Sequence, residues 1–157
     1  GLETVTAGRL RRVAEFIDGD TFCLTYGDGV SDVDITALVA FHAAHGKAAT
    51  VTAVPSPGRF GILDIGKNQS VSRFHEKPDN EMGWINGGFF VLNRKALAYV
   101  DGDGSTWERQ PLETLAADGE LRAFRHTGFW RPMDTLRDKR ELEDLWASGN
   151  APWKVWP

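Results

Sequence analysis

Apolar residues in this chain change their spacing several times, from every second position to every third or fourth position and back. The first spacing is typical of β-strands and the second of α-helices, so strands and helices are predicted to alternate. Alternation of this kind predicts an α/β fold. A chain of 157 residues is expected to form one domain, spanning residues 1–157.

The first unit of this pattern runs from a strand over residues 21–26 to a second strand over residues 49–54. Between them, Asp32 or Asp34 can cap a helix that Gly46 ends. A strand, a helix and a second strand in this order predict parallel pairing of the two strands through a right-handed crossover. The apolar face of the helix is expected to consist of Ile35, Leu38, Val39 and Phe41.

The remaining sequence predicts shorter elements and one unusual strand. Two short strands over residues 61–65 and 71–76 flank a turn-like segment. The long apolar run 84–92 contains Gly87-Gly88, and paired glycines inside a strand indicate a bulge or a close approach by another group. Further on, the pattern predicts helices over 95–100, 111–117 and 138–148 and a strand over 121–126.

Composition and charge narrow the function classes. Hydrophobic residues make up 41% of the chain and charged residues 25%, which is typical of a globular protein rather than a disordered or fibrous one. The net charge of −4 provides no general attraction to nucleic acid or to anionic lipid. No apolar run reaches the length of a membrane span, and residues 1–20 lack a signal-peptide core. A cytoplasmic protein is therefore expected.

Several side chains that could be reactive are predicted to have structural roles instead. The single cysteine, Cys23, lies in the first predicted strand, where a buried structural thiol is expected rather than a nucleophile. His42 and His45 lie three positions apart on the predicted helix without a third metal ligand, so a solvated helix face is expected for them. His75 and His126 have no obvious Ser or Cys partner, and no catalytic triad is predicted.

Asp28 lies just beyond the carboxyl end of the first predicted strand, between Gly27 and Gly29. In open α/β sheets, ligands bind in the crevice that these strand ends form. A carboxylate between two glycines lets a large ligand approach, and Mg²⁺ combines one or two carboxylates with phosphate and water. The same tripeptide is also a common surface turn, so a metal ligand and a simple turn are both open interpretations.

Asp134 follows the last predicted strand and precedes the last predicted helix. Aspartate is favoured at helix N-caps, and that role alone would explain the residue. Two carboxylates on loops beyond separate strands can also share one metal ion, and Asp28 with Asp134 is such a pair.

Glu76-Lys77, before Pro78, forms a third candidate group at the end of a predicted strand. Lys77 can neutralise a phosphate as a point charge, and Glu76 can accept hydrogen bonds from sugar hydroxyls. The alternative is a surface pair before a turn-forming proline. The sequence contains no P-loop, no dinucleotide fingerprint and no nucleic-acid-binding motif.

Seven segments, in this order along nearly all 157 residues, resemble the nucleotidyltransferases that join a sugar 1-phosphate to a nucleoside triphosphate. Within that family they are most similar to the glucose-1-phosphate cytidylyltransferases. Each segment alone is weak evidence, but seven in sequence are specific. The segments are Thr25-Tyr26-Gly27-Asp28-Gly29-Val30, Pro57-Gly58-Arg59-Phe60-Gly61, Glu76-Lys77-Pro78, Trp84-Ile85-Asn86-Gly87-Gly88-Phe89-Phe90, Trp107-Glu108 with Pro111-Leu112-Glu113, residues 128–139, and Ala151-Pro152-Trp153-Lys154.

This resemblance implies a doubly wound, mostly parallel, Rossmann-like sheet with a small antiparallel sugar-binding portion. It implies in-line attack of a sugar-phosphate oxygen on the α-phosphorus of CTP, which gives CDP-glucose and pyrophosphate. By the same resemblance, Asp28 and Asp134 would bind Mg²⁺ and would be catalytic together with Lys77. The sugar phosphate would be bound by Gly61, Glu76, Lys77, Asn86 and Gly87.

The family also begins with a strand, a Gly-rich loop and a Lys-Pro segment that wrap the triphosphate, and nothing in this sequence matches them. A partial domain that lacks this nucleotide-binding segment and does not turn over alone is therefore expected. The alternatives are a uridylyl or thymidylyl transferase, a non-catalytic remnant that binds sugar phosphates, and an oligomerisation module. The strand 21–26 carries neither charge nor proline, so its edge is unprotected and a homo-oligomer is expected.

Overall fold

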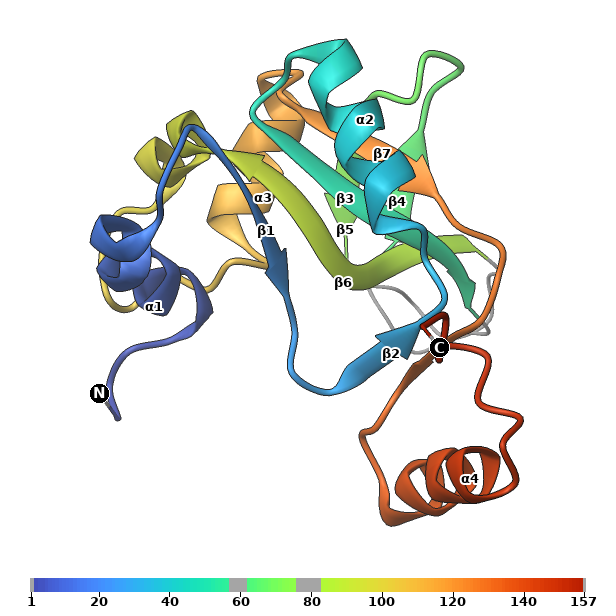
Figure 1. Cartoon of the computed structure of the whole chain (residues 1–157). Coiled ribbons are helices and arrows are strands. Elements are labelled where there is room, and N and C mark those ends of the chain that lie inside the picture. Colours follow the sequence, from blue (N-terminus) through green and yellow to red (C-terminus); the bar gives the residue numbers. More distant parts are fainter. Residues whose placement is uncertain (1, 57–61, 76–82, 157) are drawn as a thin grey trace.

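The computed structural model describes residues 2–56, 62–75 and 83–156, and Figure 1 labels its elements. Within these residues six strands form one sheet in the order β5-β4-β6-β3-β7, and β1 also pairs with β6. The predicted α/β class is confirmed, and so is a small antiparallel portion, formed by β4 and β5. The strands are β1 (Thr21–Thr25), β3 (Ala49–Ser56), β4 (Ile62–Ile65), β5 (Val71–His75), β6 (Gly83–Asn93) and β7 (Leu121–Arg125).

The central part of the sheet consists of β1, β6, β3 and β7. β3 pairs with β7 in parallel, and β1 runs in the same direction as both. The expected direct pairing of β1 with β3 is wrong, because β6 lies between them and is antiparallel to each. Phe90 of β6 is opposite Leu24 of β1 on one side and Val51 of β3 on the other. Hydrophobic spacing indicates that a segment is a strand but does not indicate its neighbour.

Helices cover both faces of the sheet, as a doubly wound fold requires (Figure 1). On one face, α1 and α3 enclose a cluster that includes Val51, Phe90 and Trp107, each at most 1% exposed. On the other face lies α2, which begins after the predicted cap Asp34 and ends at the predicted Gly46, where φ is 63°. The helices in the described ranges are α1 (Thr6–Val13), α2 (Ile35–His45), α3 (Gln110–Ala117), α4 (Leu136–Ala147), and the 3₁₀ helices η1 (Ala14–Phe16) and η2 (Arg94–Tyr99).

Helix α1 was not predicted from the sequence, and it packs on the segment 101–108 that precedes α3. The Val5 N–H donates to the Asp103 carbonyl at 3.0 Å, and the Trp107 N–H donates to the Thr6 hydroxyl at 2.8 Å. A β-carbon on Gly8 would overlap the Asp103 backbone, so this close approach requires glycine. The position of α1 is therefore determined by its contacts with a distant segment rather than by its own sequence pattern.

The buried face of α2 differs from the predicted one. Leu38 is 1% exposed, but Ile35 and Val39 face solvent. His42 is buried, so the expected solvated face for the histidines is wrong. His42 Nδ1 and His45 Nε2 each lie 2.8 Å from the same partner, the Thr50 hydroxyl of β3. A hydroxyl from the sheet thus satisfies two imidazoles that the helix spacing places on its inner face.

These two histidines predict an acid-sensitive fold. Burial lowers the pKa of His42, and burial together with nearby positive charge lowers the pKa of His45 to about 4. The unfolded chain therefore binds more protons than the folded chain between about pH 6.5 and pH 4, so stability is present above this window and is lost as the pH falls through it. The unfolding midpoint should fall by roughly 4 °C from pH 7 to pH 5.

The matched variant is His45→Gln, which keeps a hydrogen-bonding group near Thr50 but does not titrate. Calorimetry should show a clearly smaller fall in the unfolding midpoint for this variant than for the unmodified chain. The same fall in both proteins would contradict the assignment of the acid sensitivity to His45.

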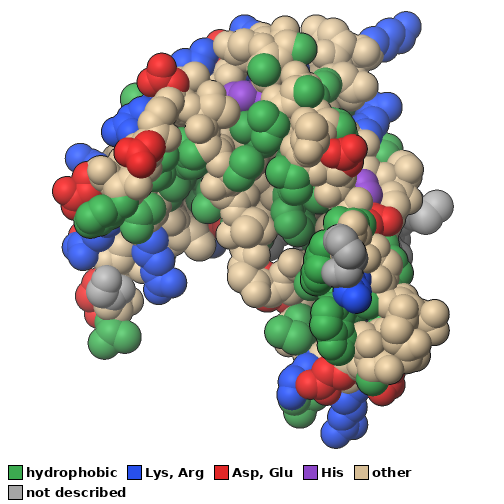
Figure 2. Space-filling view, in the orientation of Figure 1, with side chains coloured by type: hydrophobic (Ala, Val, Ile, Leu, Met, Phe, Trp, Pro, Cys, Tyr) green, Lys and Arg blue, Asp and Glu red, His purple; other side chains and the backbone are tan. Residues whose placement is uncertain are grey.

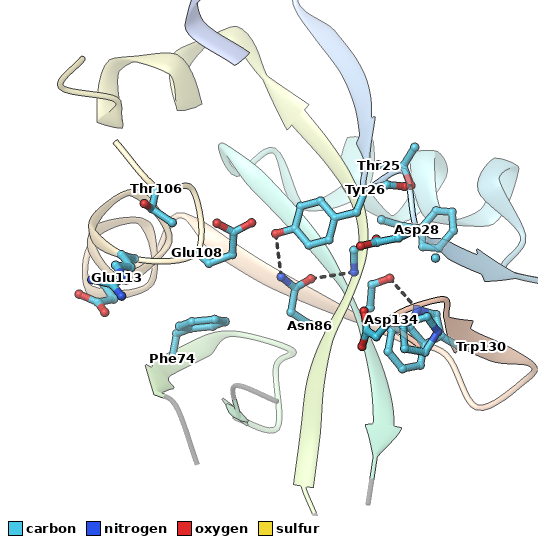
Figure 3. A pocket seen from close by; sticks show the side chains of 16 residues that line it. Thr25, Tyr26, Asp28, Phe74, Asn86, Thr106, Glu108, Glu113, Trp130 and Asp134 are labelled. Carbon is cyan, nitrogen blue, oxygen red and sulfur yellow. Dashed lines mark hydrogen bonds between the residues drawn. The ribbon is translucent and has the colours of Figure 1, made fainter. Parts of the chain in front are cut away.

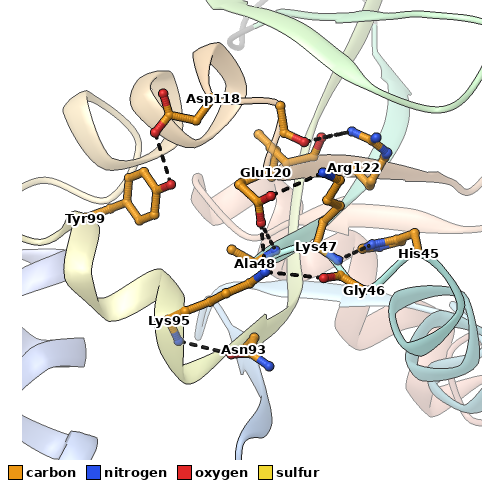
Figure 4. Close-up of polar contacts among 12 residues, drawn as sticks. His45, Gly46, Lys47, Ala48, Asn93, Lys95, Tyr99, Asp118, Glu120 and Arg122 are labelled. Atoms are coloured by element: carbon orange, nitrogen blue, oxygen red, sulfur yellow. Dashed lines mark hydrogen bonds and ion pairs between the residues drawn. The ribbon is translucent and has the colours of Figure 1, made fainter.

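One carboxylate joins three segments where β3 and β7 begin (Figure 4). Glu120 contacts the ammonium groups of Lys95 at 2.9 Å and Lys47 at 3.2 Å, and it accepts a hydrogen bond from the Ala48 N–H. The hydrogen bond with Lys95 is the main reason that the pKa of Glu120 is lowered to about 2. This cluster ties η2 to the starts of the parallel pair.

Cys23 is exposed, which contradicts the predicted buried thiol. Alternation along β1 directs Phe22 and Leu24 toward the core cluster and directs Cys23 to the face that carries the exposed Thr21 and Thr25. None of the described helices combines the length and apolar character needed to cross a membrane.

Candidate active site

A cavity of about 610 Å³ opens beside the carboxyl end of β1 (Figure 3). Its walls come from that strand end, the middle of β6, the segment that leads into α3, and a short strand near the C-terminus. Four residues predicted from the sequence line it together: Asp28, Asn86, Gly87 and Asp134. Gly61, Glu76 and Lys77 lie outside the described residues, so their roles remain predictions.

Gly87 and Gly88 form the predicted bulge in β6. The register between β3 and β6 shifts here, between Val51 and Ala53 of β3, and Gly88 has φ of 77°. A β-carbon on Gly88 would lie 2.8 Å from the Tyr26 ring, so the close approach that paired glycines indicated is also confirmed. The bulge removes side-chain bulk from one wall of the cavity and lets Tyr26 pack against it.

Asn86 and Tyr26 hold each other in place on that wall. The Asn86 amide donates to the Tyr26 hydroxyl at 3.1 Å, and its oxygen accepts from the Gly88 N–H at 2.8 Å. Burial raises the pKa of Tyr26, and a hydrogen bond to Glu108 raises it further. Tyr26 therefore keeps its proton, and Asn86 retains one amide hydrogen for a ligand.

Both aspartates are carried by a small two-stranded ribbon, formed by β2 (Gly29–Ser31) and β8 (Trp130–Pro132). Asp28 directly precedes β2, Asp134 follows β8, and the Met133 N–H donates to the Asp28 carbonyl at 2.6 Å. The ribbon is attached to the sheet at the bulge, where the Trp130 indole N–H donates to the Gly87 carbonyl at 2.7 Å. The two carboxylates are thus brought to one end of the ribbon, in the same cavity.

Asp134 is not the cap of the last helix, so that alternative is wrong. Thr135 caps α4, since its hydroxyl accepts from the Asp138 N–H and the Asp138 carboxylate accepts from the Thr135 N–H. The Asp134 carboxylate is therefore not used to cap the helix. Asp28 does lie in a turn, as the simple interpretation held, but this turn borders the cavity.

The two aspartates offer carboxylate oxygens, which are the ligand type that Mg²⁺ prefers. Both are exposed, and neither carboxylate takes part in a hydrogen bond or ion pair within the part of the chain that the structure describes. The described residues contain no group of three or more His, Cys, Asp or Glu side chains placed to bind a metal. Two carboxylates completed by phosphate and water are a common Mg²⁺ environment, unlike that of zinc.

Glu108 is a cavity residue to which the sequence analysis gave no role. It lies at the other end of the cavity from Asp28 and Asp134, beside the Tyr26 hydroxyl (Figure 3). The Thr6 hydroxyl donates to its carboxylate at 2.9 Å. The only available signal was its membership of the motif Trp107-Glu108, which gives no direction for the side chain.

His126 has partners that the sequence did not reveal. Its Nε2 lies 3.1 Å from the Ser31 hydroxyl and 3.0 Å from an Asp32 carboxylate oxygen. Ser31 and Asp32 contact the same ring nitrogen, whereas a catalytic relay requires one on each nitrogen. The arrangement around His126 is therefore not that of a triad.

Comparisons with known proteins identify the family to which this chain belongs. A family model described as nucleotidyl transferase matches residues 2–130. The chain is 58% identical to the glucose-1-phosphate cytidylyltransferase of Salmonella typhimurium (strain LT2), and 42% identical to a Bacillus subtilis (strain 168) protein described as "Probable glucose-1-phosphate cytidylyltransferase". Each alignment covers 99% of this chain and 61% of the relative.

Among solved structures, HddC from Yersinia pseudotuberculosis has a similar fold, with a TM-score of 0.76 at 20% identity. The match covers 91% of this chain and 63% of HddC. The chain therefore shares the overall fold of this solved structure. The chain belongs to the nucleotidyl transferase family, and it spans 61% of the length of the curated relatives named above.

Proposed function

We propose that the protein containing this chain is a glucose-1-phosphate cytidylyltransferase, which joins glucose 1-phosphate to CTP and releases pyrophosphate. The observation that carries the proposal is the 58% identity, over 99% of this chain, to a relative of that name. The gathering of Asp28, Asp134, Asn86 and Gly87 around one cavity supports it.

The reaction requires no nucleophilic side chain, because an oxygen of the sugar phosphate attacks the α-phosphorus and pyrophosphate leaves. Asp28 and Asp134 would hold Mg²⁺, which supplies positive charge that offsets the charge developing on the phosphates. Lys77 is proposed to bind the sugar phosphate as a point charge, and Glu76 and Gly61 to contact the sugar. The chain's part in the reaction is to bind and orient two polyanions.

The cavity also favours one orientation of the sugar phosphate. Its phosphate belongs at the end that carries Asp28 and Asp134, where a cation would be held. Its hydroxyl groups then extend along Asn86 toward Glu108, whose carboxylate accepts hydrogen bonds from hydroxyl donors. Sugar selectivity is therefore proposed to depend on the Glu108 end of the cavity.

Glucose 1-phosphate should bind the 157-residue chain weakly, with a dissociation constant on the order of 1 mM. Glu108→Gln should weaken this binding about tenfold, because a hydrogen bond to a charged acceptor is replaced by a neutral one. The measurement is titration calorimetry with glucose 1-phosphate and, in parallel, with inorganic phosphate, whose affinity should not change.

Glu113→Gln is the matched control, since Glu113 is a second carboxylate that lines the cavity but is exposed. It should change the affinity for glucose 1-phosphate by less than about twofold. Failure of the unmodified chain to bind any hexose 1-phosphate would contradict the proposed function. Equal affinities of the unmodified chain and Glu108→Gln would remove only the role of Glu108.

A further inference from the structure

The ribbon that carries both aspartates is a separate sheet, so its position depends on the side chains that attach it to the main sheet. Trp130 makes one attachment, to the bulge of β6. His126 makes a second attachment. Its backbone N–H donates to the Ala53 carbonyl of β3 at 2.9 Å, while its side chain contacts the end of β2 and the residue before β8.

The surroundings of His126 Nε2 determine where its proton lies. Three oxygen atoms surround this nitrogen: the Ser31 hydroxyl at 3.1 Å, the Asp32 carboxylate at 3.0 Å and the Phe129 carbonyl at 3.2 Å. The carboxylate and the carbonyl can only accept. Ser31 also offers no proton, because its hydroxyl donates to the Phe129 carbonyl at 2.8 Å. Nε2 must therefore carry a hydrogen, since its lone pair would otherwise face three acceptors.

Two further observations show that the local structure encloses the contact between His126 and Asp32. The His126 side chain is only 11% exposed. The neighbouring Asp32 oxygen is buried without a hydrogen-bond partner among the described residues, and His126 Nε2 lies 3.0 Å from it. A β-carbon on Gly128 would lie 2.5 Å from that Asp32 oxygen and 2.7 Å from the His126 ring. The loop can therefore enclose the pair only with glycine at this position.

We propose that His126 is a positioning residue for the aspartate site. The Nε2–H group of His126 holds the ribbon against β3 and β7, and this contact determines where Asp28 and Asp134 lie relative to Asn86 and Gly87. His126 touches none of these four residues and acts through Ser31, Asp32 and Phe129. The inference rests on the proposed function only in assigning a divalent cation to the two aspartates.

The test compares His126→Phe, which keeps a ring but removes the donor, with His126→Gln, whose amide nitrogen can replace Nε2. Two quantities are measured on the folded 157-residue chain: the dissociation constant for Mn²⁺ by electron paramagnetic resonance, and the indole ¹H–¹⁵N resonance of Trp130. His126→Phe should weaken Mn²⁺ binding about tenfold and shift the Trp130 resonance, because partners that orient metal ligands have effects of this size. His126→Gln should restore both.

Controls separate positioning from a general loss of stability. His45→Gln removes another inward-facing histidine, on α2 and away from the cavity, and should leave the Mn²⁺ affinity and the Trp130 resonance unchanged. If His126→Phe does not fold, Asp32→Asn replaces it, since this variant removes the charge next to Nε2 and should also shift the Trp130 resonance and weaken Mn²⁺ binding.

The possible outcomes are distinct. Unchanged Mn²⁺ affinity in folded His126→Phe or Asp32→Asn would overturn the positioning role, as would His126→Gln behaving like His126→Phe or no Mn²⁺ binding by the unmodified chain. Effects on Mn²⁺ binding in a chain that binds no sugar phosphate would keep the positioning role and reject the proposed function instead.

Discussion

Replacing Asp28 by asparagine is expected to abolish the binding of a divalent cation to the site, and Asp134→Asn should do the same. Each substitution removes one of the two carboxylates that are proposed to hold the ion, and a site of two carboxylates depends on both charges. Mn²⁺ titration in the presence of glucose 1-phosphate and CTP should show a loss of at least about 100-fold for either variant. The double variant should bind no more weakly than each single variant, because either loss alone should already abolish binding of the ion that the two carboxylates are proposed to share.

Stability measurements accompany this test. Both carboxylates are exposed and free of hydrogen bonds and ion pairs in the described ranges, so either substitution should change the free energy of unfolding by less than about 0.5 kcal/mol. Asp64→Asn, an exposed carboxylate on β4 outside the cavity, is the control and should bind Mn²⁺ normally. Single variants that each still bind one Mn²⁺ with unchanged affinity would indicate two separate sites.

Self-association is the second large effect that we expect. β1 pairs with β6 alone among the described strands, so one edge presents unpaired backbone N–H and C=O groups. The strand contains neither charge nor proline, the usual protection of such edges. Figure 2 shows hydrophobic side chains across the middle of the face that is turned to the viewer. Burial of such surface contributes about 25 cal/mol per Å², and an antiparallel pairing of two β1 strands about a two-fold axis is expected.

Cys23 offers a sharp test of this pairing because it is exposed at the middle of β1. A two-fold axis near the strand centre brings the two copies of residue 23 close together. Cys23→Lys should therefore give a monomer through repulsion between like charges, whereas Cys23→Ser should remain a dimer and excludes a disulfide as the cause. Light scattering at high micromolar concentration distinguishes these cases. A monomeric unmodified chain would contradict the pairing.

The fold could be predicted as far as local sequence determines it. The cap at Asp34, the end at Gly46 and the bulge at Gly87 and Gly88 each follow from the conformational preferences of the residue concerned. The insertion of β6 between β1 and β3 could not be predicted, because strand order depends on contacts between distant segments. The buried His42 was missed for a related reason, since its partner Thr50 lies on another element.

The candidate site also contains some residues that the sequence predicts and others that it does not. Asp28 and Asp134 were predicted as a pair because each follows a strand, and the structure brings them to one cavity. Glu108 and His126 carry no comparable local signal. Glu108 borders the cavity because α1 and Tyr26 hold its carboxylate, and His126 acquires its three acceptors only when the ribbon forms.

The docking of α1 on residues 101–108 has a consequence for synthesis of the chain. The hydrogen bonds that hold the helix connect Thr6 to Trp107 and Glu108, which are 101 and 102 positions later. At ribosomal rates of about 5–20 residues per second, roughly 5 to 20 s separate the appearance of α1 from that of its partner. A helix of eight residues is unstable by itself in water. In the nascent chain, α1 therefore stays unfolded and open to chaperones and proteases until residue 108 has left the ribosome.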